Sequence, residues 1–263
     1  MITSRDNRKL KDMRQLVRSK TDRALLEGPH LVGAAIDAGK SLEAVFATPE
    51  FLQRPEGQLL LARLPSPPIE VAEPLLDEIA DADSPRGLLA ICELPRSGVE
   101  SLPVQVEGIY LYASALQDPG NLGSIARAAE AAGATGLALG EGSAHPNHPR
   151  ALRASTGSLL RLPVARNVGV EQLQSHLESM STTWLALDSG EGASIHEVTT
   201  TGGLVLMTGS EGAGLPSEAL AAADLKVSIP MAKPVESLNV VTAAAIALFE
   251  FRRRRSAEVT RRA

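Results

Sequence analysis

Residues 108–133 read GIYLYASALQDPGNLGSIARAAEAAG, a stretch that combines an apolar run, a turn and an amphipathic segment. The apolar run at 108–115 predicts a buried strand. The Asp-Pro-Gly-Asn sequence at 118–121 is typical of a turn that leads into a helix N-cap. Apolar residues then recur at helical spacing, which predicts a helix over 121–132: Leu122, Ile125, Ala126 and Ala129. A strand, a turn and a helix in this order indicate an α/β fold.

The same alternation continues on both sides of this stretch. Towards the C-terminus we predict strands at 136–139, 183–187, 204–208 and 225–229, a shorter strand near Val164, and helices at 150–160, 170–179 and 237–255. Towards the N-terminus we predict strands at 24–27, 42–47, 69–72 and 87–94, and helices at 6–20, 30–38, 50–64 and 74–80. Such alternation predicts an α/β protein with a largely parallel sheet.

A break in the pattern divides the chain. Residues 95–106 contain two prolines and a glycine and have no strong period, which is typical of a linker. We therefore expect four parts: a basic N-terminal helix or extension at 1–23, a first domain at 24–94, the linker at 95–106 and a second domain at 107–263.

Composition narrows the class of protein. The chain has 263 residues, of which 44% are hydrophobic and 22% charged, as in a soluble globular protein of one large or two medium domains. No apolar run approaches the roughly 18 residues of a membrane span, and the basic N-terminus lacks the apolar core of a signal peptide. The single cysteine, Cys92, excludes an intrachain disulfide and any multi-cysteine metal site. We expect a cytoplasmic protein.

Charge is unevenly distributed. Residues 1–23 carry eight basic and three acidic groups, and residues 251–263 carry six arginines and one glutamate, whereas the whole chain has a net charge of −5. Two basic ends on an acidic body suggest a polyanionic partner at the ends. The alternative is a solvated helix face at each end. Aromatic residues make up only 3% of the chain, which argues against a sheet that reads RNA bases by stacking.

Three segments combine turn residues with polar side chains. In 117–133, Arg127 lies off the apolar stripe near the start of the predicted helix, where the helix dipole disfavours a cation, so capping alone does not explain it. In 204–216 (LVLMTGSEGAGLP), an apolar strand runs into a glycine-rich turn that contains Glu211. Its glycine spacing matches neither the dinucleotide-binding pattern nor the P-loop, and an ordinary strand-to-helix loop is the alternative.

The third segment, 229–250, reads IPMAKPVESLNVVTAAAIALFE. Ser237 is the expected N-cap of a long helix, and Asn239 is expected in its first turn, where a polar group can face a ligand. We expect this helix to bury one face, formed by Leu238, Val241, Ala245 and Leu248. Its many alanines would also allow close approach of another helix.

Together, in this order, the three segments closely resemble the motifs of the SpoU-type RNA ribose 2′-O-methyltransferases of the SPOUT superfamily. The match covers D-P-x-N-x-G-x-I-x-R at 118–127, G-S-E-G-x-G-L at 209–215, and I-P-M with E-S-L-N-V at 229–231 and 236–240. Residues 153–157 fit the middle region of the family. Residues 25–39 and 84–91 resemble, more loosely, the L30e-like substrate-binding domain of two-domain members.

The resemblance implies an N-terminal L30e-like α/β domain that binds substrate and a C-terminal SPOUT α/β domain with a deep trefoil knot, a rare exception among chain topologies. It implies S-adenosylmethionine as cofactor, bound by Thr208, Gly209, Ile229, Met231, Ser237 and Leu238. It also implies a homodimer, with each site built across the two-fold axis and the alanine-rich face at 241–247 in the interface.

By the same resemblance, the catalytic group comprises Arg127, Asn121, Glu211, Ser237 and Asn239. Arginine is almost never deprotonated, because its pKa lies above roughly 12, so we expect Arg127 to bind the neighbouring phosphate and orient the ribose hydroxyl. The residues expected to contact RNA are Arg5, Arg8, Lys9, Arg14, Arg18, Arg127 and Arg153.

These features favour methylation of large-subunit (23S) ribosomal RNA. The alternatives are a tRNA ribose methyltransferase and a catalytically silent RNA-binding module of the same fold. A small-molecule α/β enzyme of another class would leave the basic ends and the three motifs unexplained. We expect neither a membrane nor a metal partner, and we interpret His145 and His148 as solvent-exposed loop histidines rather than metal ligands.

Overall fold

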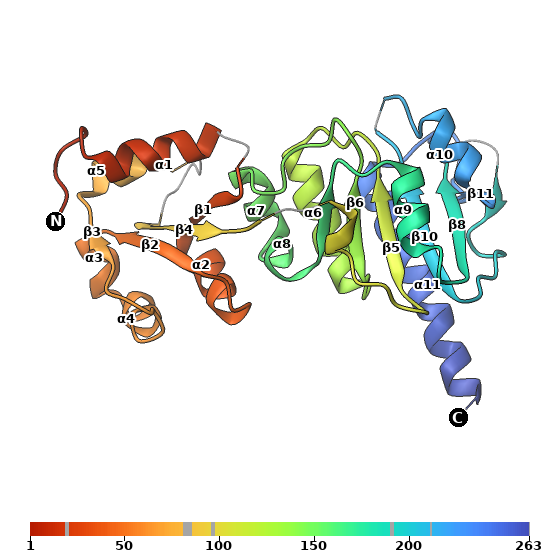
Figure 1. Cartoon of the computed structure of the whole chain (residues 1–263), viewed down its shortest axis with the longest axis horizontal. Helices are drawn as coiled ribbons and strands as arrows, with labels where there is room; N and C mark the ends of the chain where they lie inside the picture. Colours follow the sequence, from red (N-terminus) through yellow and green to blue (C-terminus); the bar gives the residue numbers. More distant parts are fainter. Residues whose placement is uncertain (19–20, 81–85, 96–97, 190–191, 211, 263) are drawn as a thin grey trace. The chain divides into compact units, whose positions relative to one another are not determined.

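The computed structural model describes residues 1–18, 21–80, 86–95, 98–189, 192–210 and 212–262, with the backbone alone for residue 18 and for 256–262. The chain forms two compact units (Figure 1). The N-terminal unit comprises Met1–Pro95 together with His145–Arg161, and the C-terminal unit comprises Arg96–Ala144 and Leu162–Ala263. The segment His145–Arg161, which the sequence placed in the second domain, thus belongs to the first unit.

The N-terminal unit is built on a mixed four-stranded sheet. Its strand order is β1 (Arg23–Glu27), β4 (Leu88–Glu93), β2 (Leu42–Ala47) and β3 (Ile69–Glu70). Strand β4 runs antiparallel to both β1 and β2, and only β2 and β3 are parallel. The prediction of a largely parallel sheet was therefore wrong for this unit, because alternation of strands and helices does not fix the direction in which a strand enters the sheet.

The described residues of this unit form the helices α1 (Arg8–Arg18), α2 (Gly28–Asp37), α3 (Pro49–Gln53), α4 (Pro55–Leu61), α5 (Glu73–Asp77), α7 (Pro149–Ser155) and α8 (Ser158–Arg161). The single helix predicted at 50–64 is split, because Pro55 holds the preceding Arg54 in an extended conformation. The helix predicted at 150–160 is also split, since Thr156 and Gly157 adopt left-handed backbone angles.

Residues 145–148 fasten α7 to the unit. The Asn147 side chain donates hydrogen bonds to the carbonyl oxygens of Thr21 (3.1 Å) and Leu94 (2.9 Å). The His148 Nδ1 accepts the Arg150 N–H (3.1 Å) and caps α7. His145 is 5% exposed, so its interpretation as a solvent-exposed loop residue was wrong.

The C-terminal unit contains a seven-stranded, fully parallel sheet, as predicted. Its strand order is β7 (Val164–Arg166), β6 (Gly136–Leu139), β5 (Ile109–Ala113), β10 (Gly203–Thr208), β8 (Thr182–Leu187), β11 (Leu225–Ser228) and β9 (Ala193–Ser194). Strand β9 and the short helix α10 (Ser217–Ala222) escaped the sequence analysis, because two-residue strands and single-turn helices carry almost no periodic signal. The α/β fold class with two units is confirmed.

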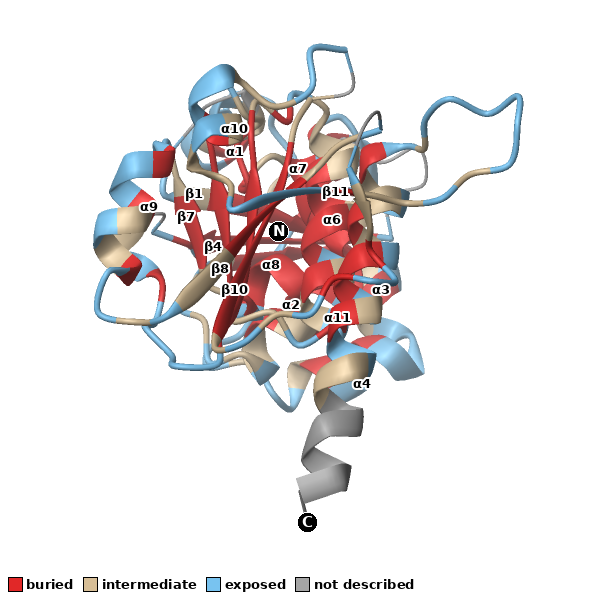
Figure 2. Cartoon of the chain, turned by 90° about the vertical axis from the view of Figure 1, so that its right-hand side faces the viewer, coloured by how far each residue is buried: buried red, intermediate tan, exposed pale blue. Residues whose placement is uncertain are grey.

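Helices cover both faces of this sheet (Figure 2). Helices α6 (Pro119–Ala131) and α11 (Val240–Arg262) lie on one face, while α9 (Val170–Leu177) and α10 lie on the other. A one-turn 3-10 helix, η1 (Val99–Ser101), lies within the predicted linker and contacts α9 and β7. Among the described residues, no helix has the length and apolar character that a membrane span requires.

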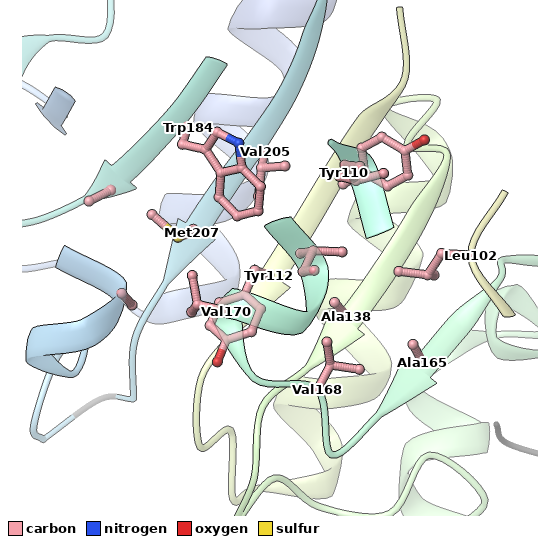
Figure 3. Packing of buried hydrophobic residues seen from close by; sticks show 14 residues of the cluster. Leu102, Tyr110, Tyr112, Ala138, Ala165, Val168, Val170, Trp184, Val205 and Met207 are labelled. Carbon is pink, nitrogen blue, oxygen red and sulfur yellow. The ribbon is translucent and has the colours of Figure 1, made fainter. Parts of the chain in front are cut away.

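Aromatic side chains fill the core on the α9 and α10 face, with Tyr110, Tyr112 and Trp184 beside Val205 and Met207 (Figure 3). Tyr110 is fully buried, and its hydroxyl donates to the Pro103 carbonyl (2.7 Å) and accepts the Gln105 N–H (3.0 Å). Because this core fixes the central strands, the carboxyl ends of β8, β10 and β11 form a rigid edge. Ligands of open parallel sheets bind at that kind of edge.

Candidate active site

A cavity of about 570 Å³ lies at the carboxyl ends of β8, β10 and β11 and beside the start of α11. It is lined by Leu187, Asp188, Ser189, Thr208, Gly209, Ser210, Gly212, Ala213, Gly214, Leu215, Leu220, Ile229, Met231, Ser237, Leu238, Asn239, Val240 and Ala243. Its size falls within the usual range for small-molecule sites. All six residues expected to bind the cofactor are among them, and their contact with a cofactor stays a prediction.

The loop after β10 folds tightly onto itself. The Ser210 N–H donates to the Gly214 carbonyl (3.2 Å), and the Gly214 N–H donates to the Ser210 carbonyl (3.1 Å). A Cβ atom at Gly209 would lie 2.0 Å from the Gly214 carbonyl carbon, a distance that no side chain tolerates. Glycine at this position therefore lets backbone groups form the cavity wall. Glu211, a predicted catalytic residue, lies outside the described residues.

Asn239 caps the helix that closes the cavity. Its carbonyl accepts the Ala243 N–H and its Oδ1 accepts the Val241 N–H, both at 2.9 Å. The expectation that Ser237 caps this helix was wrong, since α11 begins only at Val240. Asn239 was expected in the first turn; it holds the N-cap position instead, and both it and Ser237 line the cavity.

The buried face of α11 also differs from the expectation. The residues that are buried are Val240, Ala244, Ala247, Leu248 and Phe251. Only Leu248 was predicted correctly, because a helix that is apolar on nearly all sides does not reveal by periodicity which side is covered. Since α11 packs against α6 and β10, Ala244 and Ala247 serve contacts within the chain rather than an interface.

Residues of the first motif lie at the N-cap of α6 and along that helix, and none of them is among the residues that line the cavity. The Asp118 side chain caps α6 by accepting the Asn121 N–H (2.8 Å), as the turn sequence predicted. Arg127 is exposed on the same helix. Neither Asn121 nor Arg127 is among the residues that line the cavity, so the described chain brings together Ser237 and Asn239 but not all of the predicted catalytic group.

Sequence analysis did not place Leu220 or Ala243 at the cavity. It also missed Leu187, the last residue of β8, and Asp188 and Ser189, which follow that strand. These residues match no motif of the family. Strand order could have found them, because the carboxyl ends of neighbouring parallel strands meet at one edge of a sheet.

The basic C-terminal end makes contacts within its own unit. Arg252 donates to the Ala131 carbonyl, Arg254 to the Val198 carbonyl, and Arg255 to the carbonyls of Glu107 and Gly202. Arg253 and Arg254 also pair with Glu250 and hold the pKa of that carboxyl at about 2. These arginines therefore fasten α11 to neighbouring loops and helices.

Many charges of the basic N-terminal end are likewise paired. Arg5 and Arg14 both pair with Glu78, and Lys11 pairs with Asp6. Arg23 donates to both oxygens of Asp12 and of Glu43, and this hydrogen bonding lowers the pKa of Asp12. Arg8 and Lys9 are exposed on α1, and the side chain of Arg18 lies outside the description.

A second cavity, of about 860 Å³, lies within the N-terminal unit. It is lined by Glu27, Gly28, Pro29, His30, Leu31, Gly33, Glu56, Leu59, Leu60, Arg63, Arg86, Arg153 and Thr156. Arg153 pairs with the buried Glu27 (2.8 Å), and Arg63 pairs with Asp37. Arg86 and His30 are exposed, so basic groups gather around the start of α2.

Two family models match the chain. Residues 108–249 match the SpoU rRNA Methylase family, and residues 5–90 match the MRM3-like substrate binding domain. The first match covers more than half of the chain and includes all three motifs. The chain belongs to the SpoU rRNA methylase family.

Relatives of this SpoU methylase extend over nearly its whole length. The 23S rRNA (guanosine(2553)-2′-O)-methyltransferase RlmP of Bacillus subtilis is 31% identical, over 95% of this chain and 98% of the relative. The crystal structure of the SpoU methyltransferase AviRb from Streptomyces viridochromogenes with its cofactor AdoMet has a TM-score of 0.87 and 27% identity, and the match covers 95% and 98% of the two chains. The AdoMet-bound rRNA methyltransferase of Sinorhizobium meliloti has a TM-score of 0.83 and 31% identity, with 96% and 97% covered.

These matches confirm the expected reaction class, methyl transfer from S-adenosylmethionine to a ribose hydroxyl of RNA. The cavity of this SpoU methylase fits the cofactor. Apolar walls from Leu187, Ile229 and Leu238 suit an adenine ring, and the tight backbone around Gly209 offers hydrogen-bonding groups at close range.

Proposed function

We propose that this SpoU methylase methylates a ribose 2′-hydroxyl of large-subunit (23S) ribosomal RNA. The observation that carries the proposal is the cavity at the sheet edge, lined by the second and third motifs of a family whose model matches residues 108–249. The near full-length relative from Bacillus subtilis is named for 23S rRNA, which favours that substrate over tRNA.

S-adenosylmethionine supplies a methyl group on a sulfonium, and the ribose 2′-oxygen takes that methyl as the hydroxyl proton leaves. The chain must therefore align an oxygen with the methyl group and exclude water. The backbone around Gly209 and the walls from Ile229 and Leu238 hold the cofactor. Arg127 holds the phosphate next to the target ribose and orients its hydroxyl, because a guanidinium does not act as a base near neutral pH. The RNA phosphate or solvent takes the proton.

The active unit in this proposal is a homodimer. Asn121 and Arg127 lie outside the lining of the cavity, and we propose that these residues from a second copy of the chain complete the site. Ile246 (38% exposed) and Phe249 (47%) form an apolar strip on the outer side of α11, and Val235 (54%) is exposed in the third-motif loop. Burial of such a strip is a usual driving force for association. The segments of the second and third motifs are the parts we assign to the trefoil knot.

RNA docking in this proposal uses the cavity of the N-terminal unit. Arg86, Arg63 and Arg153 gather there. Arg63 and Arg153 are paired with Asp37 and Glu27, just as Arg5 and Arg14 on the N-terminal segment are paired with Glu78, so pairing with an acid does not separate the two groups. Arginines placed around a concave surface position an RNA backbone through its phosphates. In this proposal Arg153 contacts RNA together with Arg86, and the RNA contacts expected of Arg5 and Arg14 stay predictions.

The test is methyl transfer from labelled S-adenosylmethionine to unmodified transcripts of 23S rRNA, 16S rRNA and tRNA, each supplied separately to the full chain. Label in 23S rRNA alone supports the proposal. Label in tRNA alone would show that tRNA, and not 23S rRNA, is the substrate. An enzyme that binds the cofactor yet labels none of the transcripts would contradict the proposal that free 23S rRNA is methylated. An Arg127→Lys variant with full activity would exclude bidentate phosphate binding by Arg127.

A further inference from the structure

The backbone of Asp188 is held at the sheet edge that borders the cofactor cavity. It follows β8, which lies between β10 and β11 in the sheet. Its backbone N–H donates to the Val227 carbonyl (2.9 Å), which binds the residue to the end of β11. Asp188 is half-buried and lines the cavity with Gly209 and Ile229, the residues that follow the two neighbouring strands.

Asp188 is also the only ionisable residue among the described residues that line this cavity. The rest of the described lining is apolar, hydroxylic, amide-bearing or glycine. A carboxylate among apolar walls acts on the charge of a ligand more strongly than the same group in bulk water, because less solvent screens it. The ligand of this cavity therefore meets one negative side chain from the described part of the chain.

The methyl transfer changes the charge of that ligand. S-adenosylmethionine carries a sulfonium and an ammonium against one carboxylate, so its net charge is positive. The product, S-adenosylhomocysteine, has lost the sulfonium charge with the methyl group and is neutral overall. We propose that Asp188 is a specificity residue that favours the cationic cofactor over its neutral product, and so limits product inhibition. This inference rests on the cofactor of the proposed function, not on its RNA substrate.

The alternative role for Asp188 is a hydrogen bond from the cofactor ribose. That contact would hold cofactor and product equally, because both carry the same adenosine. Charge attraction distinguishes them, and at contact distance in a half-exposed site it corresponds to roughly tenfold in a dissociation constant. The two roles therefore predict different ratios of the dissociation constants for S-adenosylhomocysteine and S-adenosylmethionine, and this ratio can be measured.

The experiment is calorimetric titration of the full chain with S-adenosylmethionine, S-adenosylhomocysteine and sinefungin, an analogue with an amine in place of the methyl sulfonium. In Asp188→Asn, affinity for the two cationic ligands should fall about tenfold while affinity for S-adenosylhomocysteine stays within twofold. Retained product binding also shows that the variant is folded. Asp188→Glu keeps the charge and should keep the preference. Glu218→Gln is the control variant. Glu218 is an exposed carboxylate of the same unit that does not line this cavity, so its loss should change none of the three affinities.

Equal loss of affinity for all three ligands in Asp188→Asn would overturn the inference and assign the residue to the shared adenosine. An unchanged cofactor affinity would overturn it as well. The preference of the wild-type chain for the cationic ligands should also shrink as salt is raised. If no transcript is methylated while the preference for the cationic ligands is present, the result contradicts only the proposed RNA substrate and leaves the role of Asp188 standing.

Discussion

Gly209→Ala tests whether the tight loop after β10 builds the cofactor site. The added Cβ would lie 2.0 Å from the carbonyl carbon and 2.1 Å from the carbonyl oxygen of Gly214, and 2.3 Å from the Leu215 nitrogen. All three are backbone atoms, so no side chain can rotate away and the loop must open by more than about 1 Å. Overpacking of this kind costs about 3 kcal/mol at the upper end of the usual range. If binding requires the closed loop, the Kd for S-adenosylmethionine rises about a hundredfold.

Calorimetry of Gly209→Ala against wild type is the assay, with thermal unfolding measured in parallel. Gly212→Ala is the matched stability control in the same loop, because a Cβ there meets no atom within 4 Å and its Tm should stay unchanged. Wild-type affinity in Gly209→Ala would refute the reasoning, since it would mean that the loop is not closed when the cofactor binds.

Three further predictions concern α11 and, for comparison, Arg86 of the N-terminal unit. Asn239→Ala should lower the free energy of unfolding by about 1 kcal/mol through loss of the N-cap, and Asn239→Asp should restore it, as chemical denaturation will show. Arg255→Ala should lower the Tm yet leave the salt dependence of RNA binding unchanged, because Arg255 bonds to backbone carbonyls. Arg86→Ala should leave the Tm unchanged and reduce the salt dependence of RNA binding. The pKa of Glu250 is about 2 in the folded chain, below its ordinary value of 4.5, so its ion pairs stabilise the fold above about pH 4.5 and lose that effect as the pH falls towards 2. Glu250→Gln should flatten this part of an acid-denaturation curve.

The strand–turn–helix unit and the cavity residues could be predicted because local signals agree there. The turn at 118–121 fixes the start of α6, and the glycine-rich and Ile-Pro-Met segments follow strands whose apolar runs are unmistakable. Parallel strands then bring Thr208 and Ile229 to the same edge of the sheet. The resemblance to the family motifs is what indicated that these two loops bind the cofactor.

The remaining features depend on tertiary contacts that periodicity does not encode. The antiparallel direction of β4, the membership of His145–Arg161 in the N-terminal unit and the buried side of α11 each follow from which surfaces meet. Charge counts along the sequence do not reveal intrachain contacts of arginine side chains, for a similar reason. The arginines at 252, 254 and 255 resemble a polyanion site in the sequence, but the structure shows them bonded to backbone carbonyls within their own unit.

The position of the transferred methyl group tests the central claim most directly. Methylation of a ribose 2′-hydroxyl removes the group that alkaline cleavage of RNA requires at that nucleotide. After transfer of a labelled methyl group to 23S rRNA and complete alkaline hydrolysis, the account predicts that the label is recovered in an alkali-resistant dinucleotide. Recovery of the label in mononucleotides would place the methyl group on a base and contradict the account.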